Sequence, residues 1–463
     1  MLSEEVLLEI FDFYLCNAYY TMEWVTLVHV CREWRSIVFS APLRLDLRLV
    51  CLDRTPEREE MWGICQWPTL PIVVQVYGVT DEIGDEALAA LECRDRVCTI
   101  FAHGVSDHKL KSLAEVTRQG PFPALKDLRI EVFDDIPVPD SLLDGSAPGL
   151  RSLYLKRATF PALGKLLLST TRLVDLSLCD IADSVIINPE TMADWLPSLT
   201  GLVKLRIKYR YSWGQLLRLD QASERPPPLT RTVLPVLTTL TFNGGSHYLD
   251  LFSSIDSPLL KHVDMQFVNP PIFDFSKISQ FIGRKESFET FDQAHTMLWR
   301  GTFEVVSLWL SSRKGTTGGM WLKLSMRWKD NVWNLQSLAQ VHHPFAPPLA
   351  TWGHFDVPKL EDGYLPFWGF EPGYGQWLTF LRLFTAVENL YLSEGIAQYV
   401  APVLGELAAE ENAAIARDVL PALQSVFVER LDPSGFVQEA IGEFVAARGA
   451  SDHPVELHRW VGN

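Results

Sequence analysis

Four basic residues alternate along one short segment, at Lys204, Arg206, Lys208 and Arg210. Alternate residues of a β-strand point to the same side, so these side chains would gather positive charge on one face. Clustered basic groups bind carboxylate or phosphate groups. The segment therefore predicts either a receptor for an acidic or phosphorylated peptide, or an ordinary strand that is solvated or ion-paired.

Motifs for catalysis are weak in this sequence. Gly373-Tyr374-Gly375 lacks the third glycine of a dinucleotide loop, and Gly315 to Gly319 is not followed by the Lys-Ser/Thr of a phosphate loop. No G-x-S-x-G occurs, and no histidine pair has the H-E-x-x-H spacing of a zinc site. The closest histidine pairs are His103/His108, His342/His343 and His453/His458. We therefore expect a non-catalytic protein with no cofactor and no metal.

The alternative that the protein is an enzyme stays open. The sequence holds 15 tryptophans, and Trp352, Trp368 and Trp377 would suit either a ligand pocket or core packing. A catalytic site in residues 290–380 would use such a pocket.

Composition predicts a folded protein that does not span a membrane. The 463 residues are 47% hydrophobic and 21% charged, which allows several domains or one long repeat array. No run of 18 apolar residues occurs, so no spanning helix is expected. The net charge of −16 disfavours nucleic acid as a partner, because its phosphates would be repelled.

The cysteines and the N-terminus indicate a cytoplasmic or nuclear location. The seven cysteines are an odd number and form no C-x-x-C, which favours a reducing compartment. The acidic residues that follow Met1 argue against a secretory signal or a mitochondrial transit peptide.

The first 40 residues predict two helical segments with more apolar surface than a short helix pair can bury. Ser3 is placed to cap the first helix. Its apolar residues at helical spacing are Val6, Leu7, Ile10, Phe11 and Tyr14, with Leu8 off the stripe. A second helical run extends from Trp24 through Trp34 and ends before Pro42. The excess apolar surface needs either a partner protein or the rest of the chain.

Residues 2–40 resemble an F-box, whose pattern is L-P-x-E-[LV]-L-x-x-I-F followed by L, then V-C-[RK]-x-W-R. Here the matching segments are Leu2 to Phe11 and Leu27 to Arg35, with Ser3 in place of the proline. The resemblance implies binding to a Skp-family adaptor and, through it, to a cullin in an SCF-type ubiquitin ligase. The adaptor contacts that it implies are Leu2, Glu5, Leu7, Leu8, Ile10, Phe11, Leu27, Val30, Cys31, Trp34 and Arg35.

A repeated pattern, apolar-x-x-apolar-x-apolar, runs through the rest of the chain. Its clear copies begin at Leu125, Leu150, Leu173, Leu202, Leu237, Leu260, Val387 and Leu423, with weaker copies at Val97 and Val305. Most of the early copies are spaced like leucine-rich repeats, which recur every 20–29 residues. Stacked copies would form a parallel sheet with a buried leucine ladder, since no single copy can bury its own apolar face.

The fold class predicted is α/β: a short helical F-box followed by an irregular leucine-rich-repeat solenoid, with a curved parallel sheet and helices on its convex side. The predicted divisions are residues 1–42 for the F-box-like module, 43–94 for a linker and first repeat-like segment, 95–431 for the array, with an irregular insert at 266–386, and 432–463 for a C-terminal cap. The insert contains a predicted hairpin, Phe303 to Ser311 with Met320 to Trp328. As a whole, the chain resembles fungal F-box proteins with leucine-rich repeats.

The residues between the apolar positions of each strand would line the open concave face and bind a target protein. The residues selected for this role are Arg129, Tyr154, Lys156, Lys204, Arg206, Lys208, His262 and Tyr391. The leading hypothesis is therefore a substrate-recognition subunit of an SCF-type ligase. The alternative is a repeat-based binding scaffold whose F-box-like helices only cap the solenoid.

Overall fold

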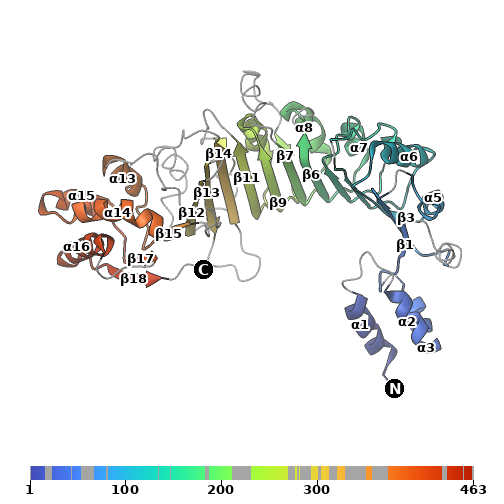
Figure 1. Cartoon of the computed structure of the whole chain (residues 1–463), viewed down its shortest axis with the longest axis horizontal. Helices are drawn as coiled ribbons and strands as arrows, with labels where there is room; N and C mark the ends of the chain where they lie inside the picture. The colour runs from blue at the N-terminus through green and yellow to red at the C-terminus, as the bar shows by residue number, and fades with distance from the viewer. Residues whose placement is uncertain are drawn as a thin grey trace. The chain divides into compact units, whose positions relative to one another are not determined.

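The computed structural model forms two compact units, Met1–Arg210 and Tyr211–Asn463. It is an α/β protein whose strands are mostly parallel (Figure 1). The residues that the structure describes are 2–15, 23–42, 44–53, 67–79, 82–133, 135–145, 147–182, 187–210, 231–268, 277–278, 281, 293–300, 304–311, 321–328, 351–356, 374–429, 435–451 and 453–460.

The N-terminus forms three helices, α1 (Glu4–Leu15), α2 (Trp24–Val30) and α3 (Arg32–Ser40). Ser3 caps α1 as predicted, because its Oγ accepts the Val6 N–H at 3.4 Å. The prediction of one continuous second helix is wrong. Cys31 is extended, with φ −157°, and its Sγ accepts the Trp34 N–H at 3.4 Å, so it ends α2 and caps α3.

The first unit holds a parallel sheet whose strands follow the chain order. The strands are β1 (Leu49–Leu52), β2 (Ile72–Tyr77), β3 (Val97–His103), β4 (Asp127–Glu131), β5 (Ser152–Lys156), β6 (Asp175–Ala182) and β7 (Lys204–Arg210). Their register aligns the repeat leucines into rows. One row is Leu128, Leu153, Leu176 and Leu205, and the next is Ile130, Leu155, Leu178 and Ile207. All these side chains are buried, so the predicted ladder is present across β4 to β7.

Helices cover the leucine face of this sheet. They are α5 (Asp85–Glu92), α6 (Asp107–Arg118), η1 (Leu142–Gly145), α7 (Leu163–Ser169), α8 (Pro189–Trp195) and η3 (Leu196–Ser198). Figure 1 draws α5 to α8 along one side of the strands. Their apolar residues, among them Leu110, Leu113, Leu166 and Leu167, are buried.

The second unit mixes parallel and antiparallel pairing. Its strands, in spatial order, are β9 (Thr239–Gly244), β11 (His262–Val268), β14 (Trp321–Trp328), β13 (Glu304–Ser311), β12 (Gln293–Arg300), β15 (Thr351–Asp356), β16 (Asn389–Leu392), β17 (Ser425–Glu429) and β18 (Glu456–Trp460). The strands of the predicted hairpin, β13 and β14, pair antiparallel. The weak repeat copy at Val305 is therefore wrong as a repeat, because β13 runs antiparallel to both of its neighbours.

The remaining elements of the second unit include a two-stranded parallel pair, β8 (Thr232–Val233) with β10 (Ile255–Asp256). The helices are η4 (Ser246–Tyr248), α10 (Leu249–Ser254), α13 (Tyr374–Leu381), α14 (Glu394–Leu407), η6 (Glu410–Asn412), α15 (Ala413–Asp418) and α16 (Phe436–Ala450). The apolar residues of α16 are only partly buried. Ala440, Ile441 and Phe444 are buried, but Phe436 is exposed and Arg448 takes a buried place.

A buried ion pair joins the first strands and helices of the sheet. Lys109 of α6 pairs with Asp53, which follows β1, and both side chains are fully buried. Lys109 Nζ also donates to the Tyr77 carbonyl at 2.6 Å. Asp53 accepts the N–H of Tyr77 at 3.2 Å and that of Gly84 at 2.5 Å. The pair therefore ties β1, β2 and the start of α5 to α6, with its polar groups satisfied.

Replacing Lys109 by Met should lower the free energy of unfolding by about 3–5 kcal/mol, because the Asp53 carboxylate would stay buried without its cation. The matched control is Lys111→Met on the same helix, which removes an exposed pair with Asp107. That change should cost less than about 0.5 kcal/mol. Urea denaturation measures both, and equal losses would show that the buried pair is not a structural tie.

Candidate functional site

The three N-terminal helices pack around a small apolar core. Leu7, Leu8 and Phe11 of α1 are buried, and the ring of Phe11 lies 4.8 Å from that of Trp34 on α3. Arg35 Nε donates to the Val28 carbonyl at 2.9 Å, which holds α3 against α2. The inner side of α1 is thus buried against the other N-terminal helices.

The outer side of α1 is also apolar, and it is exposed. Val6, Ile10 and Phe13 follow one another at steps of four and three residues, which places them on one side of the helix, and Leu2 precedes the first turn. Their exposed fractions run from 44% for Val6 to 83% for Phe13. We call these four residues the outer α1 face. Val30, at the end of α2, is exposed to 56%.

The structure divides the predicted adaptor residues into two groups. Those at the surface are Leu2, Glu5, Ile10, Val30, Cys31 and Arg35, while Trp34 is half-buried. Those in the interior are Leu7, Leu8, Phe11 and Leu27. The expected single stripe is therefore wrong, because the buried residues and Val6, Ile10 and Tyr14 lie on different sides of α1. Phe13 was missed, although its spacing from Val6 and Ile10 could have revealed it.

The polar face of the first sheet carries rows of aligned side chains. Phe101, Arg129, Tyr154, Ser177 and Arg206 occupy successive strands in one row. The selected residues Arg129, Tyr154 and Arg206 are thus brought onto one line, with Lys156 and Lys204 in the rows beside it.

Ion pairs neutralise part of this face. Arg129 pairs with Asp127 on its own strand, at 3.1 and 3.2 Å. Glu131 receives Lys156 Nζ on one oxygen and His103 Nδ1, at 3.2 Å, on the other. The charge of Lys156 is therefore partly neutralised by Glu131, so Lys156 should attract an acidic partner less strongly than the sequence predicted.

The charges around Glu131 shift its pKa. Burial acts to raise the pKa of Glu131, but the hydrogen bond and charge of Lys156, with a smaller effect from His103, outweigh it and leave the pKa below its ordinary value. The hydrogen bond to Glu131 likewise raises the pKa of Lys156, against a smaller lowering by burial. The pair is charged at neutral pH.

The last strand of the first unit bears the basic segment. Lys204 and Arg206 are exposed and Lys208 is half-buried. Among the described residues these three form no ion pair, whereas Arg210 pairs with Asp135. Arg206 and Lys208 both act to lower the pKa of the Cys179 thiol, although burial raises it more strongly. The positive charge of β7 is therefore concentrated on three residues and not four.

The two selected residues of the second unit are not brought together. His262 lies on β11 beside Thr239 and Trp321, and Tyr391 lies on β16 beside Phe427. Strands β14, β13, β12 and β15 separate β11 from β16. These residues belong to one polar face but to separate parts of it.

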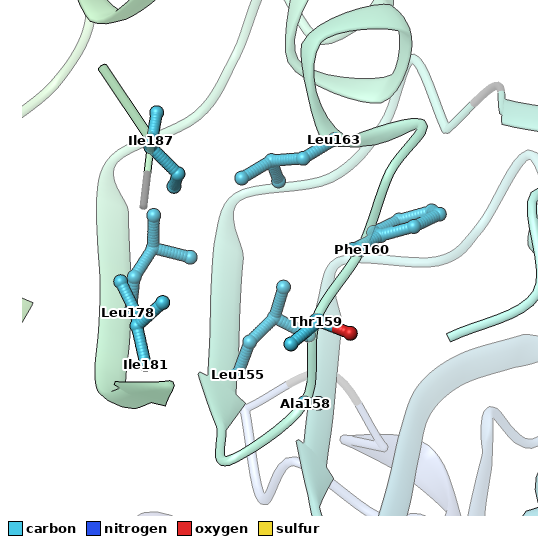
Figure 2. Close-up of a pocket in the computed structure, with 8 residues that line it drawn as sticks. All are labelled: Leu155, Ala158, Thr159, Phe160, Leu163, Leu178, Ile181 and Ile187. Carbon is cyan, nitrogen blue, oxygen red and sulfur yellow. The ribbon is translucent and has the colours of Figure 1, made fainter. Parts of the chain in front are cut away.

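One small cavity lies between β5, β6 and the segment that leads into α7 (Figure 2). Its volume is about 30 Å³. Its lining residues are Leu155, Ala158, Thr159, Phe160, Leu163, Leu178, Ile181 and Ile187. The lining offers a single hydroxyl and no acid, base or nucleophile, so the cavity is a packing defect of the apolar core.

The structure describes two of the three tryptophans that were considered for a ligand pocket. Trp352 and Trp377 are fully buried, and their rings pack on Phe380. Trp368 lies outside the described residues, as does most of the segment 290–380. Within the described part of the chain, no group of three or more His, Cys, Asp or Glu residues is placed to hold a metal ion. No helix among these residues combines the length and apolarity needed to cross a membrane.

Neither the scan of protein-family models nor the search of curated proteins finds a match for this chain.

The pair of Glu131 and Lys156 should make stability depend on pH. A lowered carboxyl pKa stabilises the fold above the unfolded-state value of about 4.3, and this contribution is lost as the pH falls through the folded-state pKa. Glu131→Gln should therefore lower the free energy of unfolding by up to about 1 kcal/mol at pH 7 and by almost nothing at pH 2.5.

Urea denaturation at the two pH values measures the difference. The control is Glu115→Gln at an exposed site on α6, which should leave both curves unchanged. A loss for Glu131→Gln that is as large at pH 2.5 as at pH 7 would contradict the assigned pairing.

Proposed function

We propose that this chain is the target-recognition subunit of an SCF-type ubiquitin ligase. In this proposal the N-terminal helices bind a Skp-family adaptor, and the polar faces of the strands bind the target protein. The chain catalyses nothing itself and acts by raising the concentration of the target near the ubiquitin-loaded enzyme. The aligned parallel strands with helices on their leucine face support the further inference that the repeats form a leucine-rich-repeat solenoid.

The observation that carries the proposal is the outer α1 face. A helix of 12 residues whose inner side already packs on its neighbours has no internal use for a second apolar side. Exposed apolar surface of this kind marks a protein interface. Its residues Leu2, Val6 and Ile10 all lie within the segment that resembles an F-box.

One observation favours the alternative of a capping module. Trp24 of α2 is buried, its Nε1 donates to the Arg48 carbonyl at 2.8 Å, and its ring lies 5.1 Å from that of Trp67. The helices are therefore attached to the segments that flank β1. These contacts are made by Trp24 on α2 and leave the outer α1 face exposed. A capping role alone therefore does not account for that face.

Replacing Ile10 by Glu should weaken adaptor binding at least about tenfold, because the charge would enter an apolar interface. The matched control is Leu168→Glu on helix α7, at a leucine that is 58% exposed where Ile10 is 45% exposed. Binding of a purified Skp-family adaptor, measured by calorimetry, should be unchanged in the control. Absence of binding by the wild-type chain would refute the proposal and favour the scaffold alternative.

The double change Lys204→Glu and Arg206→Glu should remove a subset of target proteins while the adaptor is retained. Both side chains are exposed on β7, and reversal of their charge would repel an acidic target segment. Proximity labelling with mass spectrometry compares the captured proteins. The control reverses exposed Arg118 and Arg172, which lie outside the strands. Identical losses in both double variants would rule out a specific role for β7.

A further inference from the structure

Four aromatic side chains gather on the polar face of the first unit, near the ends of β2, β3 and β4. We call Tyr77, Phe101, His103 and Phe133 the aromatic patch. The His103 ring stacks on that of Phe101, with the centroids 5.9 Å apart and the planes at 14°. It lies edge-on to the rings of Tyr77 and Phe133, at 6.4 and 6.0 Å. Phe133 is 61% exposed and the His103 side chain is 40% exposed, so a partner can reach the patch.

Phe133 is held in this exposed position from two sides. Arg157 Nη1 donates to the Phe133 carbonyl at 3.0 Å. The Phe133 ring lies against Gly104, where a Cβ atom would come within 2.4 Å of it. Gly104 has φ +65°, a conformation that favours glycine. An exposed aromatic ring that its own chain fixes loses little freedom on binding, which is typical of the anchor residues of protein interfaces.

The opposite end of the same face is basic. The register places Phe101 of β3 and Arg206 of β7 in one row, with β4, β5 and β6 between them (Figure 1). Lys204 and Lys208 flank Arg206 on the same side of β7. As described above, these three basic residues form no ion pair within the described part of the chain.

The carboxylates of the neighbouring strand β6 do not cancel this charge. Asp175 accepts the Ser177 hydroxyl at 3.0 Å, and Asp180 lies 3.9 Å from Arg157. Burial is the main cause of the raised pKa of the Cys179 thiol. Among the charges around that thiol, Arg206 and Lys208 each lower its pKa more than Asp180 raises it. The field beside β7 is therefore positive.

The stretch between the two ends is nearly neutral. Arg129 on β4 pairs with Asp127, and Lys156 on β5 pairs with Glu131. The row itself continues through the half-buried Tyr154. The face thus offers one aromatic and one basic contact region, separated by paired charges.

The register also fixes how far apart these regions are. Adjacent strands lie about 4.8 Å apart, so Phe101, four strands from Arg206, is about 19 Å from it. Phe133 follows β4, three strands from β7, which corresponds to about 14 Å across the sheet. An extended chain advances about 3.3 Å per residue, so the two regions match side chains about four to six residues apart.

We propose that β3 to β7 bind an extended target segment that crosses the strands. In this proposal a large apolar side chain lies on the aromatic patch, and an Asp or Glu about four to six residues away binds Arg206 and Lys208. The carboxylate matches the charge of β7, and the apolar side chain covers the exposed Phe133 ring. The inference rests on the proposed function for the identity of the partner, a target protein. It adds that the target is recognised by spacing as well as by charge.

A peptide array probed with the purified full-length chain tests the spacing. Each peptide has a Phe-Leu anchor and a Glu pair, separated by one to nine Gly or Ser residues, in both orders. Binding should pass through a maximum at about three to five intervening residues in one order, at least about fivefold above the signal at one or nine. A signal that does not depend on the separation, or no binding at any separation, would overturn the proposal.

Two protein variants locate the contacts, with fluorescence polarisation of the best peptide as the measurement. Phe133→Ser and Arg206→Ser should each raise the dissociation constant at least about fivefold. The matched controls should leave it unchanged. They are Phe436→Ser on α16, which is also 61% exposed, and Arg118→Ser at an exposed arginine on α6.

A cycle of changes in both molecules assigns each contact. Replacing the Phe-Leu anchor of the peptide by Ser should weaken binding to the wild-type chain, but should have no further effect in Phe133→Ser. Replacing the Glu pair by Gln should likewise have no further effect in Arg206→Ser. If Phe133→Ser lacks the thermal transition of the wild type, the Arg206→Ser half of the cycle and the dependence on separation decide the question.

An equal loss in Phe436→Ser, or full sensitivity to the peptide anchor in a folded Phe133→Ser variant, would place the anchor elsewhere and refute the site. The assay contains no adaptor. The Ile10→Glu variant should therefore show the same maximum, and a failure of adaptor docking is distinguishable from a failure of this site. Loss of the maximum in Ile10→Glu would place the anchor on the outer α1 face and would also refute the proposal.

Discussion

The register of the parallel strands is the constraint on which the rest of the structure depends. In the first unit it places Leu128, Leu153, Leu176 and Leu205 in one buried row, which the helices then cover. A shift of one residue would turn these leucines to solvent and their polar neighbours inward. The same register aligns Arg129, Tyr154 and Arg206 on the opposite face. The register therefore determines both the core and the candidate target surface, and neither can change without the other.

The proposed binding surfaces differ in the interactions that they offer to a partner. The outer α1 face is apolar and compact, so it suits a tight and constant partner such as an adaptor. The polar faces carry separated charges, among them the basic strand β7 in the first unit. Charges at a rim govern specificity and association rate more than affinity, which suits a surface that selects among targets.

The sequence predicted the strands well where one apolar pattern recurs, because buried leucines at alternate positions allow only one face to be inside. It failed where pairing depends on residues distant in sequence. The hairpin of β13 with β14 was predicted, but nothing in the Val305 segment reveals that β12 pairs antiparallel on its other side. The break at Cys31 was missed because apolar spacing alone does not report an extended residue between two helices. The side of α1 that is buried was also misjudged, since both sides are apolar and only the packing of Phe11 on Trp34 decides between them.

Hydrogen exchange of the chain with and without a purified Skp-family adaptor tests the central claim most directly. The account predicts slower amide exchange in α1 and in the segment from Val30 to Arg35, with no change in the strands of either unit. Protection of strands β4 to β7 by the adaptor, or no protection anywhere at adaptor concentrations that saturate a known F-box, would contradict it.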